Sequence, residues 1–162
     1  MSSVDLAVSL VRKMENEDFR VLQALELGMS QYRFVPLEEI VKYSGLPPSE
    51  AEFRIAGLHK SGLLYSQSGA YVGYVLNNAG YDCLAINALV KGVVLEAFGK
   101  SLGVGKEADV YDALTPEGEQ VAVKFHRIGR TSFRDTRRKR GYEEERGASW
   151  LYRSRLAAEK EF

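Results

Sequence analysis

GVGKEADV at residues 103–110 and VAVK at residues 121–124 are the stretches that decide the fold of the second half of this chain. The first places glycines in a turn between two apolar segments. Between the two stretches, TPEG at residues 115–118 has Pro and Gly where a type I turn prefers them. We therefore predict three consecutive antiparallel strands, a β-meander and not a βαβ unit, over residues 95–102, 108–114 and 120–126.

The spacing of the glycines excludes a P-loop. That motif needs a glycine, four further residues and then Gly-Lys-Ser/Thr, followed by a helix. Counting back from Gly99 the required glycine falls on Val94, and counting back from Gly105 it falls on Lys100. Neither glycine-lysine pair therefore fits.

The same residues match the ATP-binding pattern of protein kinases, in which a glycine-rich turn joins two antiparallel strands and its amides close over phosphates. Residues 103–110 match Gly-x-Gly-x-x-Gly-x-Val except that Ala108 replaces the third glycine. VAVK is close to the kinase phrase Val-Ala-Ile-Lys. A lone glycine turn is weak evidence, but the turn and the lysine in this order predict an ATP site. Its candidate residues are Gly103, Gly105, Lys106, Glu107, Ala108, Val110, Ala122 and Lys124.

Lys124 is the candidate phosphate-binding side chain. Strand alternation places Ala122, Lys124 and His126 on one face of the third strand. This arrangement suits ATP, because it puts a small residue beneath the adenine and a lysine at the phosphates on the same face. The lysine carries a compact charge on a flexible stem, which suits contact with phosphate oxygens. The competing interpretation is a solvated lysine on an edge strand.

The first half of the chain shows a different organisation. Apolar residues recur at helical spacing in residues 3–29, 37–41 and 51–58, and Ser49 with Glu52 has the spacing of a capping box. Two strands, residues 63–65 and 71–75, follow, and then a further helix. Helices followed by a two-stranded ribbon predict a winged helix-turn-helix domain. We expect this domain to occupy residues 1–91 and a second one residues 92–162.

Composition favours no particular partner, because 22 Lys and Arg balance 22 Asp and Glu. No apolar run approaches the ~20 residues of a membrane span, and no signal peptide is evident. We therefore expect no membrane association and a cytoplasmic location. Cys83, among apolar neighbours, is predicted to be a buried, reduced thiol.

A block of arginines followed by glutamates occupies residues 127–147. Such blocks are usually solvated, so a flexible basic loop is predicted, with nucleic-acid contact as the alternative. A helical pattern then resumes and stops at Phe162. A natural domain seldom ends in this way, which suggests a truncated sequence or a fragment.

Taken together, these residues resemble the RIO family of atypical serine/threonine protein kinases, in the branch with an N-terminal winged helix. GKEADVY at residues 105–111 and VKFHRIGRTSFR at residues 123–134 carry the resemblance, and FVPL at residues 34–37 supports it. The implied fold is α+β: a winged helix-turn-helix followed by the antiparallel strands and the start of the C-helix of a protein-kinase-like N-lobe.

The resemblance also implies an ATP-dependent kinase or ATPase that uses Mg²⁺ and acts in small ribosomal subunit maturation, with pre-ribosomal RNA and protein as partners. Lys124 and Glu161 would be its catalytic ion pair, although spacing alone does not distinguish Glu159 from Glu161. The family commonly has serine where Ala108 stands. Thr131 or Ser132 would be a self-phosphorylation site.

Phosphoryl transfer also needs a catalytic-loop Asp and Asn and a metal-binding Asp. By the resemblance these groups, including the Mg²⁺ ligands, would lie beyond Phe162, so we expect no metal ligands and no activity in the chain as given. One alternative is a winged-helix regulator that binds nucleic acid and has a non-catalytic C-terminal module. However, the presumed recognition helix, residues 49–61, mixes acidic with basic residues and so matches a phosphate backbone poorly. Another alternative is an adaptor that uses the kinase-like lobe only as a scaffold.

Overall fold

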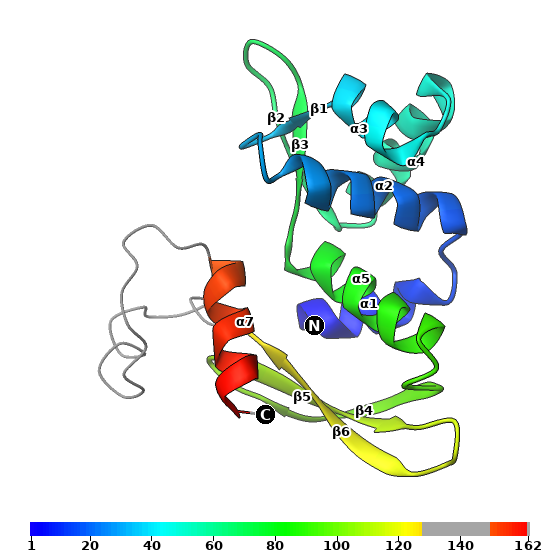
Figure 1. Cartoon of the computed structure of the whole chain (residues 1–162), viewed down its shortest axis with the longest axis vertical. Helices are drawn as coiled ribbons and strands as arrows, with labels where there is room; N and C mark the ends of the chain where they lie inside the picture. The colour runs from blue at the N-terminus through cyan, green and yellow to red at the C-terminus, as the bar shows by residue number, and fades with distance from the viewer. Residues whose placement is uncertain (128–149, 162) are drawn as a thin grey trace. The chain divides into compact units, whose positions relative to one another are not determined.

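A computed structural model describes residues 1–127 and 150–161. The chain divides into two compact units, Met1–Gly92 and Val93–Phe162 (Figure 1). Each unit has its own antiparallel sheet, so the two are described separately.

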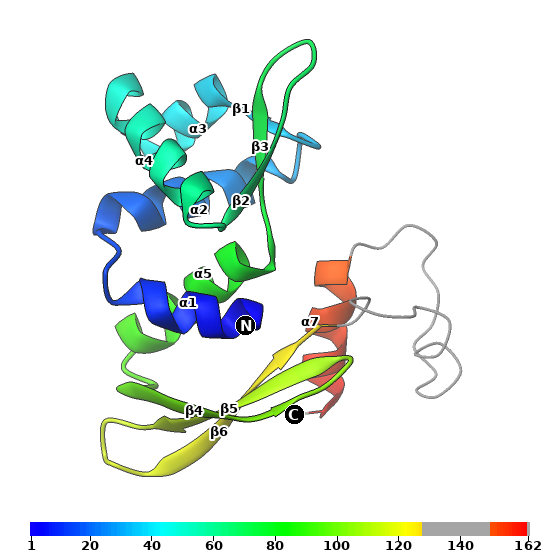
Figure 2. The same ribbon diagram turned by 180° about the vertical axis from the view of Figure 1, so that it is seen from behind.

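The first unit is the predicted winged helix-turn-helix (Figure 2). Its sheet has the strand order β1-β3-β2. The helices are α1 (Ser3–Val11), α2 (Asn16–Gly28), α3 (Leu37–Ser44), α4 (Pro48–Lys60) and α5 (Asn78–Lys91), and the strands are β1 (Val35–Pro36), β2 (Leu64–Gln67) and β3 (Gly73–Leu76).

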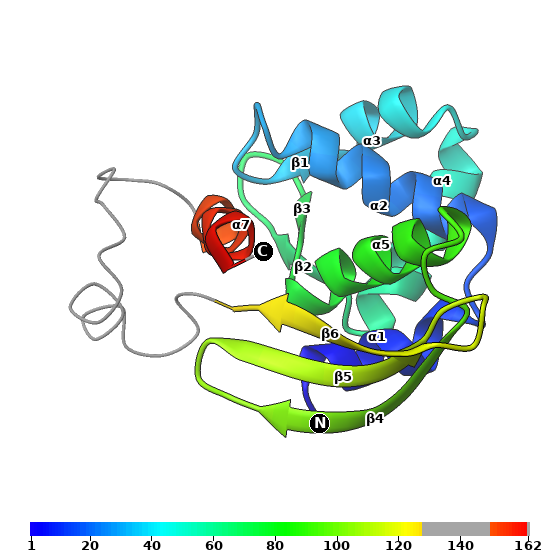
Figure 3. The ribbon, with the colours of Figure 1, turned by 60° about the horizontal axis from the view of Figure 1, so that its bottom comes forward.

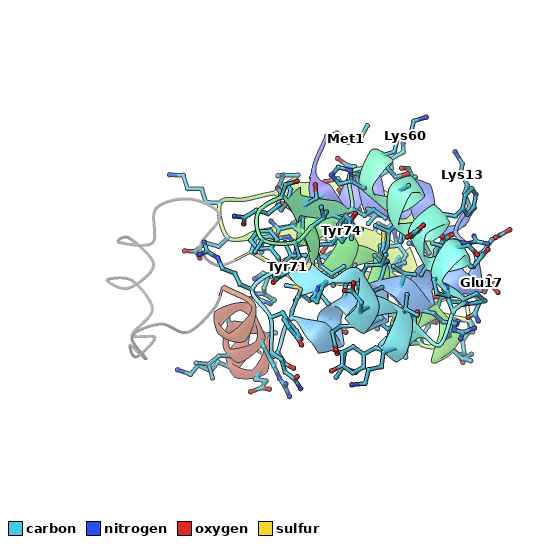
Figure 4. The ribbon with its side chains drawn as sticks, turned by 90° about the horizontal axis from the view of Figure 1, so that it is seen from above. Met1, Lys13, Glu17, Lys60, Tyr71 and Tyr74 are labelled. Atoms are coloured by element: carbon cyan, nitrogen blue, oxygen red, sulfur yellow. The ribbon has the colours of Figure 1, made fainter. Side chains whose placement is uncertain are left out.

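Two local predictions for this unit were wrong. The ribbon has a third strand, β1, which pairs with β3 and is too short for a periodic signal. The Tyr71 hydroxyl, labelled in Figure 4, donates to the carbonyl oxygen of Phe34 at 2.8 Å beside this strand. The capping box is also absent from α4, because the helix begins at Pro48 and leaves Ser49 inside the first turn. Proline suits that position because its missing N–H has no helical partner there.

The core of the first unit is mostly aliphatic. Its largest fully buried aliphatic side chains come from α1, α2, α3, β1 and the start of the wing: Val4, Val21, Leu22, Leu25, Val35, Ile40 and Leu63. Cys83 on α5 is also fully buried, as predicted. Burial, with a contribution from Asp82, raises the pKa of the Cys83 thiol to about 12.

The second unit contains the predicted β-meander, β4 (Ala97–Val104), β5 (Ala108–Leu114) and β6 (Gln120–His126), in that order across the sheet (Figure 3). The first strand begins two residues later than predicted and continues to Val104. The TPEG turn forms as expected, with the N–H of Gly118 donating to the carbonyl oxygen of Thr115 at 2.9 Å. The final helix is α7 (Trp150–Glu161).

One face of this sheet is buried. Tyr111 and Ala113 on β5 and Phe125 on β6 are at most 6% exposed, and the Tyr111 and Phe125 rings meet edge to face with centroids 6.0 Å apart. Because side chains alternate along a strand, the opposite face carries Val110 and Lys124. The buried face therefore anchors the sheet and leaves the Lys124 face to carry the site.

The predicted basic loop lies outside the described residues except for its first member. Arg127 is 6% exposed, so including it in a solvated segment was wrong. Its guanidinium lies over the Phe125 ring, 5.7 Å from the centroid. Of the helices in the described ranges, none is long and apolar enough to cross a membrane.

Candidate functional site

A row of three residues crosses the second sheet at the predicted site. Gly103 on β4 pairs with Val110 on β5, and Val110 pairs with Lys124 on β6. Residues directly opposite each other in an antiparallel sheet share a face, so all three belong to the same surface. A Cβ added to Gly103 would meet no atom of the described chain within 4 Å. The row therefore has open space at its Gly103 end and a cation at the other.

Two further cross-strand pairs flank this row on the same face. Ala122 pairs with Asp112, and Ala108 pairs with His126. Ala122, Lys124 and His126 thus share one face of β6, in the phase that strand alternation requires. The side chain on this face is small at Ala122 and polar at Lys124 and His126.

The turn between β4 and β5 is tight. The N–H of Gly105 donates to the carbonyl oxygen of Ala108 at 2.8 Å, and a Cβ on Gly105 would lie 3.1 Å from that oxygen. Lys106 is exposed at the turn and Glu107 is half-buried. The carbonyl oxygen of Glu107 accepts from the N–H of Arg127, which joins the turn to the end of β6. Lys106 and Glu107 thus stand at the turn and outside the row of Gly103, Val110 and Lys124.

Helix α7 brings Glu161 to Lys124. The Nζ of Lys124 forms an ion pair with Oε1 of Glu161, and the two side chains are 35% and 47% exposed. Glu159 instead forms an ion pair with Arg155 on its own helix, at 3.1 Å. A half-exposed pair adds little to stability, on the order of 1 kcal/mol or less. The main effect of the ion pair is to fix the position of the Lys124 amine on the exposed face of the sheet.

Two features of this region went unnoticed in the sequence. The Nε2 of His126 lies 3.6 Å from Oε2 of Glu161, and the His126 side chain is only 11% exposed. Asp109 on β5 is fully buried. Strand alternation, which places His126 on the same face as Lys124, was a signal in the sequence that could have pointed to the His126 contact. The burial of Asp109 has no such signal, because a buried carboxylate in a strand beside a turn has no local sequence pattern.

Across residues 1–127 and 150–161, no group of three or more His, Cys, Asp or Glu side chains gathers in a way that could hold a metal ion. The site described in this part of the chain is therefore a lysine, a carboxylate and a glycine-rich turn.

Two family models match the chain. The model described as "Rio2, N-terminal" matches residues 11–92, just over half of the chain, and the model described as "RIO domain" matches residues 109–162. The chain belongs to the Rio2 family. The RIO match includes both Lys124 and Glu161, and the Rio2 N-terminal match covers most of the winged helix.

Named Rio2 relatives agree with this assignment. A serine/threonine-protein kinase RIO2 of Caenorhabditis elegans is 43% identical over 157 residues, covering 96% of this chain and 30% of the relative. A RIO-type serine/threonine-protein kinase Rio2 of Methanocaldococcus jannaschii is 44% identical over 135 residues, covering 83% of this chain and 49% of the relative. The chain thus spans half or less of the length of these two kinases.

A solved structure shares the fold. The Rio2 kinase of Chaetomium thermophilum, in a structure described as an ADP/Mg²⁺-phosphoaspartate complex, superposes with a TM-score of 0.79 at 35% identity. The match covers 94% of this chain and 46% of that one. The winged helix followed by a kinase-like N-lobe is therefore shared by this chain and the matched part of that one.

Proposed function

We propose that this chain supplies the winged helix and the ATP-binding lobe of a RIO-type serine/threonine protein kinase or ATPase. The observation that carries the proposal is the Lys124–Glu161 ion pair, placed on the same sheet face as the open Gly103 position. Kinases need such a pair between the third strand and the C-helix to hold the ATP phosphates.

The residues present fit ATP. Gly103 leaves room for a ligand above the sheet, Ala122 offers a small surface for adenine, and Lys124 supplies a cation for phosphate oxygens. Val110, Gly105 and Ala108 would frame the nucleotide, with Lys106 and Glu107 at the turn. When bound, ATP with Mg²⁺ supplies the phosphoryl group. The related Chaetomium thermophilum Rio2 kinase, described as a complex with ADP and Mg²⁺, supports this choice of cofactor.

The test is a lysine substitution in the full-length protein. Lys124→Met should weaken MgATP binding by about 10- to 150-fold, since a hydrogen bond to a charged group is worth about 1.5–3 kcal/mol. Lys60→Met is the matched control, because Lys60 is exposed at the end of α4 (Figure 4). Calorimetric titration measures both. Unchanged MgATP binding by Lys124→Met would contradict the proposal and favour the adaptor interpretation.

We further propose that the protein acts in small ribosomal subunit maturation, in contact with pre-ribosomal RNA and protein; a cytoplasmic location belongs to the same proposal. This proposal rests on the resemblance of residues 105–111 and 123–134 to the RIO kinases. The alternative, a regulator that reads duplex DNA through α4, is not favoured by the contacts of Arg54. That side chain already binds Glu50, Glu15 and Asp18, and so is not directed at a phosphate backbone.

The two partners can be separated by competition. Binding of the whole chain to small-subunit ribosomal RNA, measured at two salt concentrations, should survive an excess of duplex DNA. Displacement by duplex DNA at equal mass would contradict a preference for ribosomal RNA, because binding through the phosphate backbone alone does not distinguish the two polymers.

A further inference from the structure

His126 lies at the point where the predicted phosphate turn, the lysine strand and α7 meet. It is the last residue of β6 and stands opposite Ala108 at the end of the turn. It lies two residues after Lys124, so both side chains occupy the same face. Its side chain is 11% exposed, whereas Lys124 is 35% exposed. The imidazole is therefore the more desolvated of the two groups facing Glu161.

The backbone beneath His126 is held on both sides. The strand pairing joins His126 to Ala108, and the next N–H, that of Arg127, donates to the carbonyl oxygen of Glu107. Phe125 on the other side of His126 is buried against Tyr111. The backbone position of His126 is thus set by the sheet.

Each oxygen of the Glu161 carboxylate meets a side chain of β6. Oε1 meets the Nζ of Lys124, and Oε2 lies 3.6 Å from the Nε2 of His126. That distance is within ion-pair range but longer than a hydrogen bond, so a shift of well under 1 Å would close it. Glu161 is 47% exposed, and a glutamate held by one oxygen alone can rotate into solvent. A second donor on a fixed strand restricts that rotation.

We propose that His126 is a positioning residue: its Nε2–H holds Oε2 of Glu161, so that Oε1 stays on Lys124 and the lysine amine stays over the phosphate position. This inference rests on the proposed ATP site for its consequence in catalysis. The geometric part stands apart from it, because both contacts of the Glu161 carboxylate are made with side chains of this chain.

Two variants test the role of Nε2 in the full-length protein. His126→Phe keeps a ring but removes the donor, whereas His126→Gln places an amide N–H near the former Nε2. The chain has two histidines, and His59→Phe, at the exposed end of α4, is the matched control. The first measurement is the rate at which an amine-reactive ester modifies Lys124, followed by peptide mass spectrometry. The second is kcat/KM for ATP, with the thermal midpoint as a check on folding.

We expect His126→Phe to raise the Lys124 modification rate and to lower kcat/KM, by about 3- to 30-fold each. Changes of this size lie within the range of coupling found between contacting side chains. His126→Gln and His59→Phe should stay within about twofold of the wild type. In a Glu161→Gln background, His126→Phe should have no further effect, because the group it acts through is already lost. A merely structural histidine would instead give additive losses and no rescue by glutamine.

The two hypotheses fail in different ways. If Lys124→Met leaves MgATP binding unchanged while His126→Phe still exposes Lys124, the ATP site is wrong and the positioning role stands. If Lys124→Met abolishes binding while His126→Phe leaves the modification rate and kcat/KM at wild-type values, the positioning role is overturned. Equal losses in His126→Phe and His126→Gln would overturn it as well.

Discussion

Gly103 and Gly80 lack a side chain for different physical reasons. A Cβ on Gly80 would lie 2.6 Å from the carbonyl oxygen of Leu63, a backbone atom that cannot move aside. A Cβ on Gly103 would meet no atom of the described residues within 4 Å. Close packing inside the protein therefore accounts for Gly80, whereas no close neighbour among the described residues accounts for Gly103.

Alanine substitutions should separate these two reasons. Gly80→Ala should lower the free energy of unfolding by about 1–3 kcal/mol through overpacking. Gly103→Ala should leave the thermal midpoint unchanged, yet weaken MgATP binding at least about fivefold if the nucleotide fills the open space. Chemical denaturation and calorimetric titration of both variants provide the measurements. A destabilised Gly103→Ala with normal MgATP affinity would show that the glycine serves the fold.

Among the elements, α4 is tied to α2 through one arginine. Arg54 forms ion pairs with Glu50 on α4 (2.8 Å), with Asp18 at the start of α2 (3.5 Å) and with Glu15 just before it. The Arg54 side chain is 15% exposed and Asp18 is 16% exposed. These carboxylates, Glu50 first, raise the pKa of the Arg54 guanidinium above its usual value. The contacts fix how α4 packs beside the N-terminus of α2.

Removing this tie should be costly. Arg54→Met keeps much of the side-chain volume but leaves Asp18 without its cation, so we expect a loss of about 1–3 kcal/mol in the free energy of unfolding. Arg155→Met is the control, since Arg155 pairs with Glu159 at 80% exposure and an exposed pair contributes little. Urea titrations at low and high salt measure both variants. Equal losses would contradict the special position of Arg54.

Local sequence signals predicted most helices and strands, but they misplaced the start of α4 and missed strand β1. Asn77 caps α5 by accepting from the N–H of Gly80 at 3.0 Å, and Gly45 closes α3 in the left-handed conformation, both from residue types that favour these positions. The Ser49 capping box was wrong because a proline one residue earlier also starts a helix. Strand β1 was missed because two residues carry no alternation, and its pairing with β3 is a long-range contact.

For the whole molecule, the two units have cores drawn from separate stretches of the sequence. Leu22, Leu25 and Leu63 belong to the first core, and Tyr111 and Phe125 to the second. The family matches divide the chain in a similar way, with residues 11–92 in one model and 109–162 in the other.

Damage to one core should therefore stay local. Leu63→Ala should destabilise the first unit by about 2–5 kcal/mol, because it removes a fully buried side chain and leaves a cavity. Hydrogen exchange followed by mass spectrometry should show faster exchange across α2, α3 and α5, with β5 and β6 within about threefold of the wild type. Matching acceleration in both units would mean that they unfold as one.

The sequence by itself determined the winged helix, the three-stranded meander and the strand phase that puts Ala122, Lys124 and His126 on one face. It could do so because helical spacing, turn residues and strand alternation are properties of neighbouring residues. The partner of Lys124 was different: spacing left Glu159 and Glu161 equal, and the ion pair to Glu161 spans 37 positions. The family resemblance implied Glu161, and the tertiary structure shows the contact itself. Only the tertiary structure decided the sharing of the Glu161 carboxylate with His126 and the burial of Arg127, because both depend on how distant segments pack.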